Sequence, residues 1–462
     1  MRVEPFYRWL VPTIVSPVGQ RLGRPLWTVA RALEDLQWRS CGELQSRAME
    51  HLRVLVDHAA RHVPYYRQLF AQAGLNPRDL RSPADLARVP ISTKSDLRAR
   101  YPVDTTADNI PAQYRQRMMT SGSTGLPFEF YWDRRVSAQL GGTYLFLLGW
   151  AGAAIWHTRL LIASPSYFYN EAAPRPWWRD MIGRLLVGER NESLSSDTLT
   201  LSALRALVQR VSARGSYFIR GYPRAVAGAA AELAEAGIPL GANPRVVMTF
   251  AETLTQANAE AIHRGFGCPV VNYYSSWEVP QMAQTCPDNP QALHVNSERV
   301  IVRVVRADGS DAAPGETGRV VVTDLANFVM PFINYAPGDQ AVAGGPCPCG
   351  RGMPVLSRLE GRDGEVIKTP QGREVSGVVL GQFLTFVAGI IPYVWEYQAC
   401  QTAPAAVTLQ VVPTSRFTPE VKSKLERDLS AFLGSDVDVR VEAVDGIALE
   451  PSGKRVIIKP LP

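Results

Sequence analysis

The spacing of apolar residues predicts helices along the first third of the chain. Between Cys41 and Leu75 they recur every three or four positions, which predicts an amphipathic helix. A second stretch, Val136 to His157, has no Asp, Glu, Lys or Arg, but glycines interrupt it. We predict a buried core helix there rather than a membrane span. The segment before Cys41 carries Trp9, Trp27 and Trp38, and we expect a packing arm in preference to a membrane-surface helix.

The middle of the chain alternates short apolar runs with helical stretches. The apolar runs are Leu160–Ala163, Tyr217–Ile219, Val246–Phe250 and Val270–Tyr274. The helical stretches between the last three are Arg224–Ala236 and Thr255–Gly265. Such alternation is typical of a parallel, doubly wound sheet.

From His294 onward the pattern changes to β-strands. The segments Val300–Val305 and Val320–Thr323, with the turn Ala307–Gly309, predict antiparallel pairing. After the stretch Gly361–Glu365, a β-α-β unit is predicted from Val407–Val412, Pro419–Leu433 and Val437–Val441. We therefore predict an α/β protein with two domains. The large N-terminal domain, residues 1–361, holds doubly wound sheets and a β subdomain, and residues 362–462 form a small, mobile α+β domain.

Charge and cysteine content narrow the function classes. The 462 residues carry a net charge of +6, but no basic tract is interleaved with aromatic residues, which argues against nucleic-acid binding. A mildly basic surface suits an anionic small substrate. No signal peptide is visible at the N-terminus. The spacing of the six cysteines does not suggest a secreted disulfide framework, so we expect a cytoplasmic protein, monomeric or homodimeric, without a transmembrane segment.

The first candidate site is a loop that ends at Pro127 and contains four hydroxyl residues and two glycines. Glycines let several N–H groups point into one concavity, and hydroxyls add donors for a phosphate chain. The Lys–Ser/Thr pair of a Walker A loop is absent. A plain Ser/Gly linker is the alternative. The candidate phosphate-binding residues are Thr120, Ser121, Gly122, Ser123, Thr124 and Gly125.

Three charged residues lie where a nucleotide site needs them. Glu278 follows the apolar run that ends at Tyr274, so it is a candidate Mg²⁺ ligand at the carboxyl end of a strand. Asp339 lies at a turn, where a carboxylate accepts hydrogen bonds from ribose hydroxyls. Lys454 lies on a glycine-bearing loop and is a candidate phosphate ligand. Taken singly, each is equally an ordinary loop residue.

A Cys₃His set predicts a metal site. Two cysteines stand one residue apart in a Pro/Gly-rich knuckle, and a Cys/His pair precedes them. These donors complete a closed tetrahedral set for a structural Zn²⁺. The alternative is free buried thiols and a surface histidine. The four residues are Cys286, His294, Cys347 and Cys349.

In this order, the stretches resemble the phenylacetate-CoA ligase-like branch of the adenylate-forming superfamily, and its CapK-like members associated with capsular polysaccharide biosynthesis. The resemblance runs from about residue 45 to the end. It implies a glycine loop that wraps the ATP phosphates, with Thr124, Glu278 and Lys454 as catalytic residues. It also implies Ala251, Glu252 and Tyr274 at the nucleotide, Asp339 at the ribose, Arg362 before the hinge, Glu365 as the hinge acid, and Zn²⁺ on the Cys–His set.

The resemblance implies an ATP- and Mg²⁺-dependent ligase that adenylates a small carboxylic acid and passes the acyl group on, with coenzyme A as the expected acceptor. An amide ligase, or a turnover-deficient nucleotide-binding protein of a polysaccharide or secondary-metabolite pathway, is the alternative. The chain departs from the family pattern at Leu126, Trp277, Asn334 and Ala336. The acyl pocket is expected from Tyr222, Phe250, Tyr273 and Trp277, with the Trp277 indole favouring a small or flat acid.

Overall fold

The computed structural model describes most of the chain. The described residues are 25–119, 128–163, 190–195, 200–237, 244–362, 366–371, 374–376, 383–390, 392–448 and 456–461, with the single residues 13, 17 and 380. Within them, one 13-stranded sheet forms the centre of the molecule, and a four-stranded sheet holds most of the C-terminal strands. Two further sheets have two strands each. The expected α/β architecture is confirmed.

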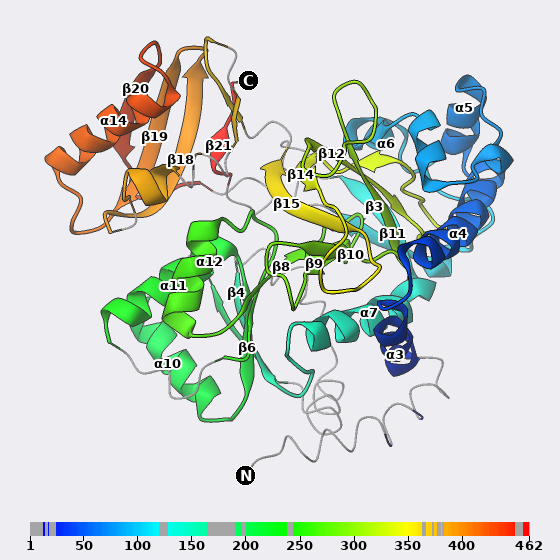
Figure 1. The fold of residues 1–462 in the computed structure, drawn as a ribbon, viewed down its shortest axis with the longest axis horizontal. Helices are drawn as coiled ribbons and strands as arrows, with labels where there is room; N and C mark the ends of the chain where they lie inside the picture. The colour runs from blue at the N-terminus through cyan, green and yellow to red at the C-terminus, as the bar shows by residue number, and fades with distance from the viewer. Residues whose placement is uncertain are drawn as a thin grey trace.

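One half of the large sheet is parallel, as the alternating pattern predicts. Its strands lie in the order β8-β7-β6-β4-β5. Apolar residues on both faces are buried: one face packs on α10, α11 and α12, and the other on α3 and α7 (Figure 1). The elements are α3 (Leu26–Leu36), α7 (Ser137–Trp150), β4 (Thr158–Ala163), β5 (Arg190–Ser195), α10 (Leu201–Ser212), β6 (Tyr217–Gly221), α11 (Pro223–Glu235), β7 (Val247–Thr249), α12 (Gln256–Phe266) and β8 (Val270–Tyr274).

The other half of the sheet is mainly antiparallel. Strand β9 turns back against β8, and the ladder continues through β10, β15, β14 and β12, with β11 paired to β12. The predicted pairing of β11 with β12 is confirmed. The strands are β1 (Ser92–Thr93), β9 (Ala283–Thr285), β10 (Leu293–Val295), β11 (Val300–Val305), β12 (Thr317–Asp324), β13 (Tyr335–Ala336), β14 (Asp339–Ala343) and β15 (Val355–Arg362).

The predicted single helix from Cys41 to Leu75 is wrong: the chain forms two helices. Val63 adopts an extended conformation between them, because the following Pro64 disfavours a helical residue before it. The helices are α4 (Cys41–His62) and α5 (Pro64–Gln72). The core helix predicted over 136–157 is confirmed as α7, which ends at Trp150. Among the described residues, no helix is long and apolar enough to cross a membrane.

The remaining N-terminal elements pack around these helices and the edge of the sheet. They are η2 (Pro77–Asp79), η3 (Pro83–Arg88), α6 (Lys94–Arg100), η4 (Ala112–Tyr114), β2 (Arg115–Met119), β3 (Glu129–Asp133) and η5 (Arg134–Val136).

The C-terminal strands form a sheet with its own core (Figure 1). Strands β19 and β20 are parallel and joined by α14, so the predicted β-α-β unit is confirmed. The buried apolar residues of this core all lie between Ile367 and Ile458. The boundary between residues 361 and 362 stays a prediction. The elements are β16 (Val366–Lys368), β17 (Glu374–Ser376), η8 (Phe383–Val387), β18 (Val394–Ala403), β19 (Ala406–Pro413), α14 (Pro419–Leu433), β20 (Asp438–Ala443) and β21 (Ile458–Lys459).

Close packing of α11 on α12 gives a test of this fold. A Cβ added at Gly265 would lie 2.6 Å from both the Cβ and the carbonyl oxygen of Ala230. We expect Gly265→Ala to lower the free energy of unfolding by about 1–3 kcal/mol because backbone must move. The matched control is Gly228→Ala, since nothing lies within 4 Å of a Cβ there, and it should be neutral or slightly stabilising. Urea unfolding measures both, and equal effects would contradict the packing.

Candidate active site

Glu278 is held by two donors in the loop between β8 and β9. Its side chain is almost fully buried, and Lys94 Nζ lies 2.9 Å from its carboxylate. The hydroxyl of Tyr335 donates to the same oxygen, Oε1, at 3.1 Å. Lys94 begins α6 and Tyr335 lies on β13, so three distant segments meet at this carboxylate. The sequence gives no signal for Lys94, because its pairing with Glu278 is non-local.

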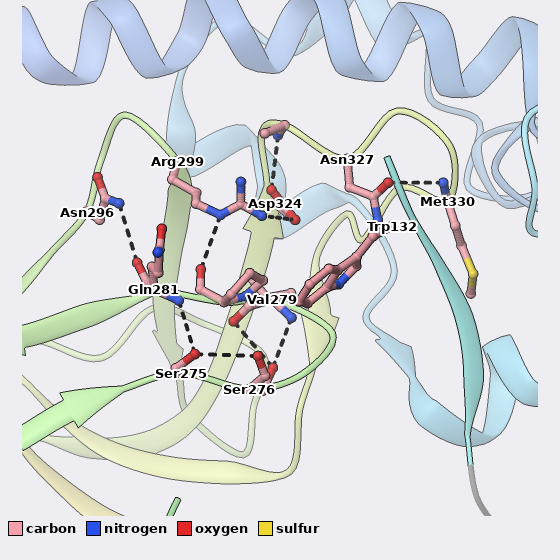
Figure 2. Close-up of polar contacts among 12 residues, drawn as sticks. Trp132, Ser275, Ser276, Val279, Gln281, Asn296, Arg299, Asp324, Asn327 and Met330 are labelled. Atoms are coloured by element: carbon pink, nitrogen blue, oxygen red, sulfur yellow. Dashed lines mark hydrogen bonds and ion pairs between the residues drawn. The ribbon is translucent and has the colours of Figure 1, made fainter. Parts of the chain in front are cut away.

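Short hydrogen bonds fix the shape of the Glu278 loop (Figure 2). Ser276 Oγ accepts from the Val279 N–H at 3.0 Å, and Ser275 Oγ accepts from the Gln281 N–H at 3.2 Å. Gln281 has a φ of 61°, a left-handed conformation that is uncommon outside glycine. The two serines that precede Trp277 therefore hold the loop in shape.

A buried ion pair supports the loop that follows Glu278. Arg299 Nε donates to the Pro280 carbonyl at 3.1 Å, and its Nη2 donates to Asp324 Oδ2 at 2.9 Å (Figure 2). Both side chains are buried. Burial raises the pKa of Asp324, while the Arg299 guanidinium opposes that shift. Asp324 also accepts from the Ala326 N–H at 3.0 Å.

The predicted site residues Tyr274, Asp339 and Arg362 lie close together. The Tyr274 hydroxyl donates to Asp339 Oδ2 at 2.7 Å. Asp339 begins β14 and stands directly opposite Arg362 of β15 in the antiparallel ladder. Three positions chosen separately from the sequence are thus neighbours at one end of two strands.

Ala251 and Glu252 follow β7 at the carboxyl edge of the parallel strands. Ala251 has a φ of 67°, a backbone conformation that is costly for a residue with a side chain. Arg224 Nε lies 4.0 Å from a Glu252 oxygen. The same guanidinium stacks 5.6 Å from the ring of Tyr397 on β18 and donates to its carbonyl at 3.4 Å. This contact joins α11 to the C-terminal sheet.

Three of the four predicted pocket residues lie in one apolar cluster. Tyr222, Phe250 and Tyr273 belong to the core between the parallel strands and α7, and the rings of Tyr222 and Phe250 meet edge to face at 5.5 Å. Burial raises the pKa of Tyr273 to about 12. Trp277 packs instead against the other large core, and its carbonyl accepts from Trp132 Nε1 at 2.9 Å. Its place in the acyl pocket stays a prediction.

Asn334, one of the departures from the family pattern, is a buried structural residue. Its Nδ2 donates to the Val89 carbonyl at 2.6 Å, and its carbonyl accepts from the Ser92 N–H at 3.0 Å. Arg303 Nη1 donates to its Oδ1 at 2.9 Å. Asn334 therefore fixes the segment that delivers Lys94 to Glu278.

The four predicted metal ligands converge. Their donor atoms all lie within 4.8 Å of one another. Cys349 Sγ is 3.3 Å from His294 Nε2, and Cys347 Sγ is 4.0 Å from Cys286 Sγ. Ligand–ligand separations of this size fit a tetrahedral Zn²⁺ with bonds of about 2.0–2.3 Å. No position remains open for a substrate, so the donor set suits a structural ion.

Surrounding residues orient these ligands. His294 Nδ1 lies 3.1 Å from the Met353 carbonyl, which leaves Nε2 facing the thiols. The Arg351 N–H donates to Cys349 Sγ at 3.5 Å, and the Arg351 guanidinium stacks between Trp38 and Trp150. Arg351 thereby connects the knuckle to the segment that follows α3 and to the end of α7.

Several predicted site residues lie outside the described residues. These are the glycine loop with Thr120, Ser121, Gly122, Ser123, Thr124 and Gly125, the lysine Lys454 and the hinge acid Glu365.

Comparison with known proteins identifies the relatives of this chain. It is 27% identical over 345 residues to the phenylacetate-coenzyme A ligase of Escherichia coli, covering 72% of this chain and 75% of that protein. It is 25% identical to the enzyme of the same name from Thermus thermophilus, covering 70% and 72%. The chain is thus similar in sequence to phenylacetate-coenzyme A ligases. Protein CapK of Staphylococcus aureus is 19% identical over 96% of the chain and 95% of its own length. No family model matches the present chain.

A solved structure shares the fold. The 2-hydroxyisobutyryl-CoA ligase in its postadenylation state, bound to an acyl-AMP, aligns with a TM-score of 0.73 at 19% identity. The alignment covers 92% of this chain and 91% of that one. This likeness supports the fold.

The Arg299–Asp324 pair gives the stability prediction for the site. Arg299→Met leaves a buried carboxylate without its cation, and we expect a loss of about 3–5 kcal/mol in the free energy of unfolding. Adding Asp324→Asn removes the stranded charge and should recover a large part of that loss. Arg306→Met is the control, because Arg306 pairs with Glu316 at the surface and should cost less than about 1 kcal/mol. If urea titrations gave Arg299→Met and Arg306→Met the same loss in the free energy of unfolding, the structural role of the buried pair would be contradicted.

Proposed function

We propose that this protein is an AMP-forming acid–thiol ligase that adenylates a small carboxylic acid and transfers the acyl group to coenzyme A. The observation that carries the proposal is the hydrogen bond from Tyr274, at the end of β8, to Asp339, which stands opposite the backbone of Arg362. The buried Glu278 lies in the loop that follows β8. The sequence relatives named above support the reaction class. The fold shared with a ligase bound to an acyl-AMP is consistent with it.

In the first half-reaction, a carboxylate oxygen of the acid attacks the α-phosphorus of ATP, and pyrophosphate leaves. Asp339, aligned by Tyr274, is suited to accept hydrogen bonds from the ribose. The glycine loop and Lys454 are the expected phosphate ligands, stabilising charge as it develops. Mg²⁺, bound near Glu278, would neutralise phosphate charge. In the second half-reaction, the coenzyme A thiolate attacks the acyl carbonyl and AMP leaves.

Lys94 places a positive charge next to Glu278. Its Nζ contacts Glu278 and lies 6.0 Å from the Phe128 ring centroid, next to the end of the glycine loop. The Lys94 ammonium forms an ion pair with the Glu278 carboxylate and so compensates the buried negative charge of Glu278. The glutamate is therefore held in one orientation before nucleotide arrives.

The reaction is tested by pyrophosphate–ATP exchange with a panel of carboxylic acids. We expect exchange that depends on acid and Mg²⁺, and a fall of about 100-fold or more in Lys454→Ala, because transition-state charge loses a fixed partner. Glu278→Gln should raise the Mg²⁺ concentration needed for half-maximal exchange. Lys459→Ala is the matched lysine control and should exchange normally. A folded protein that binds ATP yet exchanges with no acid would favour the turnover-deficient alternative, and exchange without thioester formation would favour an amine acceptor.

For the metal, we propose one structural Zn²⁺ on Cys286, His294, Cys347 and Cys349. Purified protein should contain about one equivalent of zinc by elemental analysis. Cys347→Ser should lose the metal and melt at a lower temperature, because binding free energy contributes to folding. Cys400→Ser is the control, since this thiol lies on β18 in the C-terminal sheet. Full zinc content in Cys347→Ser would rule out this ligand set.

A further inference from the structure

An open cavity of about 560 Å³ lies between α4, η2 and the segment that follows β12. Three arginines line it: Arg53 and Arg61 from α4, and Arg78 from η2. None of the residues that line this cavity belongs to the predicted nucleotide, acyl or metal sites. Helix α4 lies on the side of the large sheet away from the C-terminal sheet (Figure 1). The cavity is therefore distinct from the candidate active site.

Helix α4 and the cap of η2 place the charged groups of the cavity. Arg53, Asp57 and Arg61 follow one another at intervals of one helical turn, so their side chains share one face of α4. Asn76 Oδ1 accepts from the Arg78 N–H at 3.0 Å, which fixes the backbone of η2 at Arg78. Two elements thus bring their arginines to one cavity.

The cavity has more positive than negative charge. Asp57 supplies the carboxylate of the lining, and its Oδ1 lies 2.8 Å from Arg61 Nη2. Within the part of the chain that the structure describes, the side chains of Arg53 and Arg78 form no ion pair or hydrogen bond. Burial lowers the pKa of His58, so the arginines and not this ring supply the charge. Two guanidinium groups thus have their donors available to a ligand.

Apolar side chains complete the walls. Phe328, Val54 and Pro77 line the same cavity, and Val54 is 60% exposed although it is hydrophobic. The Phe328 ring meets the His58 ring edge to face at 5.2 Å between centroids. His58 Nε2 also lies 2.9 Å from the Phe328 carbonyl oxygen, so both contacts hold Phe328 against α4. The cavity therefore combines cations with a fixed aromatic surface.

This combination favours an organic phosphate over other anions. A guanidinium donates two parallel N–H groups to one phosphate or carboxylate. A phosphate monoester carries a charge of about −1.5 to −2 at neutral pH and has three acceptor oxygens, so it can engage two arginines at once. A carboxylate has a single charge and two oxygens. The volume also falls within the range of about 300–1,000 Å³ that is typical of small-molecule sites.

We infer that this cavity is a binding site for a small organic phosphate monoester. Arg53 and Arg78 hold the phosphate, and the organic part of the ligand packs on Val54 and Phe328. This site adds to the proposed ligase function and does not depend on it.

Calorimetric titration of the full chain with phenyl phosphate tests the site. We expect binding that weakens about 10- to 100-fold when Arg53→Gln and Arg78→Gln are combined, because the phosphate loses charged hydrogen bonds. Arg53→Lys with Arg78→Lys keeps the charge but loses the paired donors, so its affinity should be intermediate. The matched control combines Arg416→Gln and Arg427→Gln, which removes two exposed arginines from the C-terminal part of the chain and should bind like the native protein.

Two further ligands separate the contributions of charge and ring. Phenyl sulfate keeps the ring with one negative charge, and inorganic phosphate lacks the ring, so each should bind more weakly than phenyl phosphate. Lys454→Ala, at the predicted phosphate ligand of the nucleotide site, should leave phenyl phosphate binding unchanged.

The inference is overturned if the native chain does not bind phenyl phosphate, or if the Arg53→Gln, Arg78→Gln variant binds it equally well. Loss of binding in Lys454→Ala alone would also refute it, because the phosphate would then occupy the nucleotide site. So would equal affinity for phenyl phosphate and either of the other two ligands. Melting temperatures of all variants verify that they are folded.

Discussion

The loop of the candidate active site depends on the buried ion pair between Arg299 and Asp324. Arg299 spans from the Pro280 carbonyl to Asp324, so one guanidinium ties the loop after Glu278 to the end of β12. Such a pair gains little net stability over apolar packing, because both charges are desolvated. The pair instead restricts the conformation of the loop, because the planar guanidinium of Arg299 donates hydrogen bonds in fixed directions. The hydrogen bonds of Ser275 and Ser276 fix the same loop at other backbone positions.

Buried, directional hydrogen bonds also bring distant segments together at Glu278. Asn334 has a φ of 49° and its side chain bonds to Val89 and Arg303, so it orders the entry to α6. Lys94 then reaches the carboxylate from a helix start. Within the described part of the chain, three non-glycine residues have left-handed backbone, and all of them flank the candidate site: Ala251, Gln281 and Asn334. Strained backbone of this kind persists only where the surroundings enforce it.

The sequence predicts elements with strong local patterns and misses contacts between remote segments. Strand β8 and helix α14 begin and end at the expected residues, because each has an uninterrupted apolar pattern and clear flanking turns. The break at Pro64 was visible in the sequence, but the apolar spacing continues across it and concealed the end of α4. The convergence of the four candidate metal ligands was predictable because their Cys and His spacing is typical of a zinc site. Lys94 and Arg299 were missed, since an isolated Lys or Arg carries no sign of its partner.

The stack of Arg224 on Tyr397 also sets how firmly the C-terminal sheet rests on α11. A cation–π contact of this kind contributes about 0.5–2 kcal/mol, and the accompanying hydrogen bond is long at 3.4 Å. An increment of that size changes the ratio of attached to detached forms by only about 2- to 30-fold. This contact therefore biases the resting position of the C-terminal sheet without locking it. Because Arg224 Nε also lies 4.0 Å from a Glu252 oxygen, a change that draws the guanidinium closer to Glu252 would weaken its contact with Tyr397.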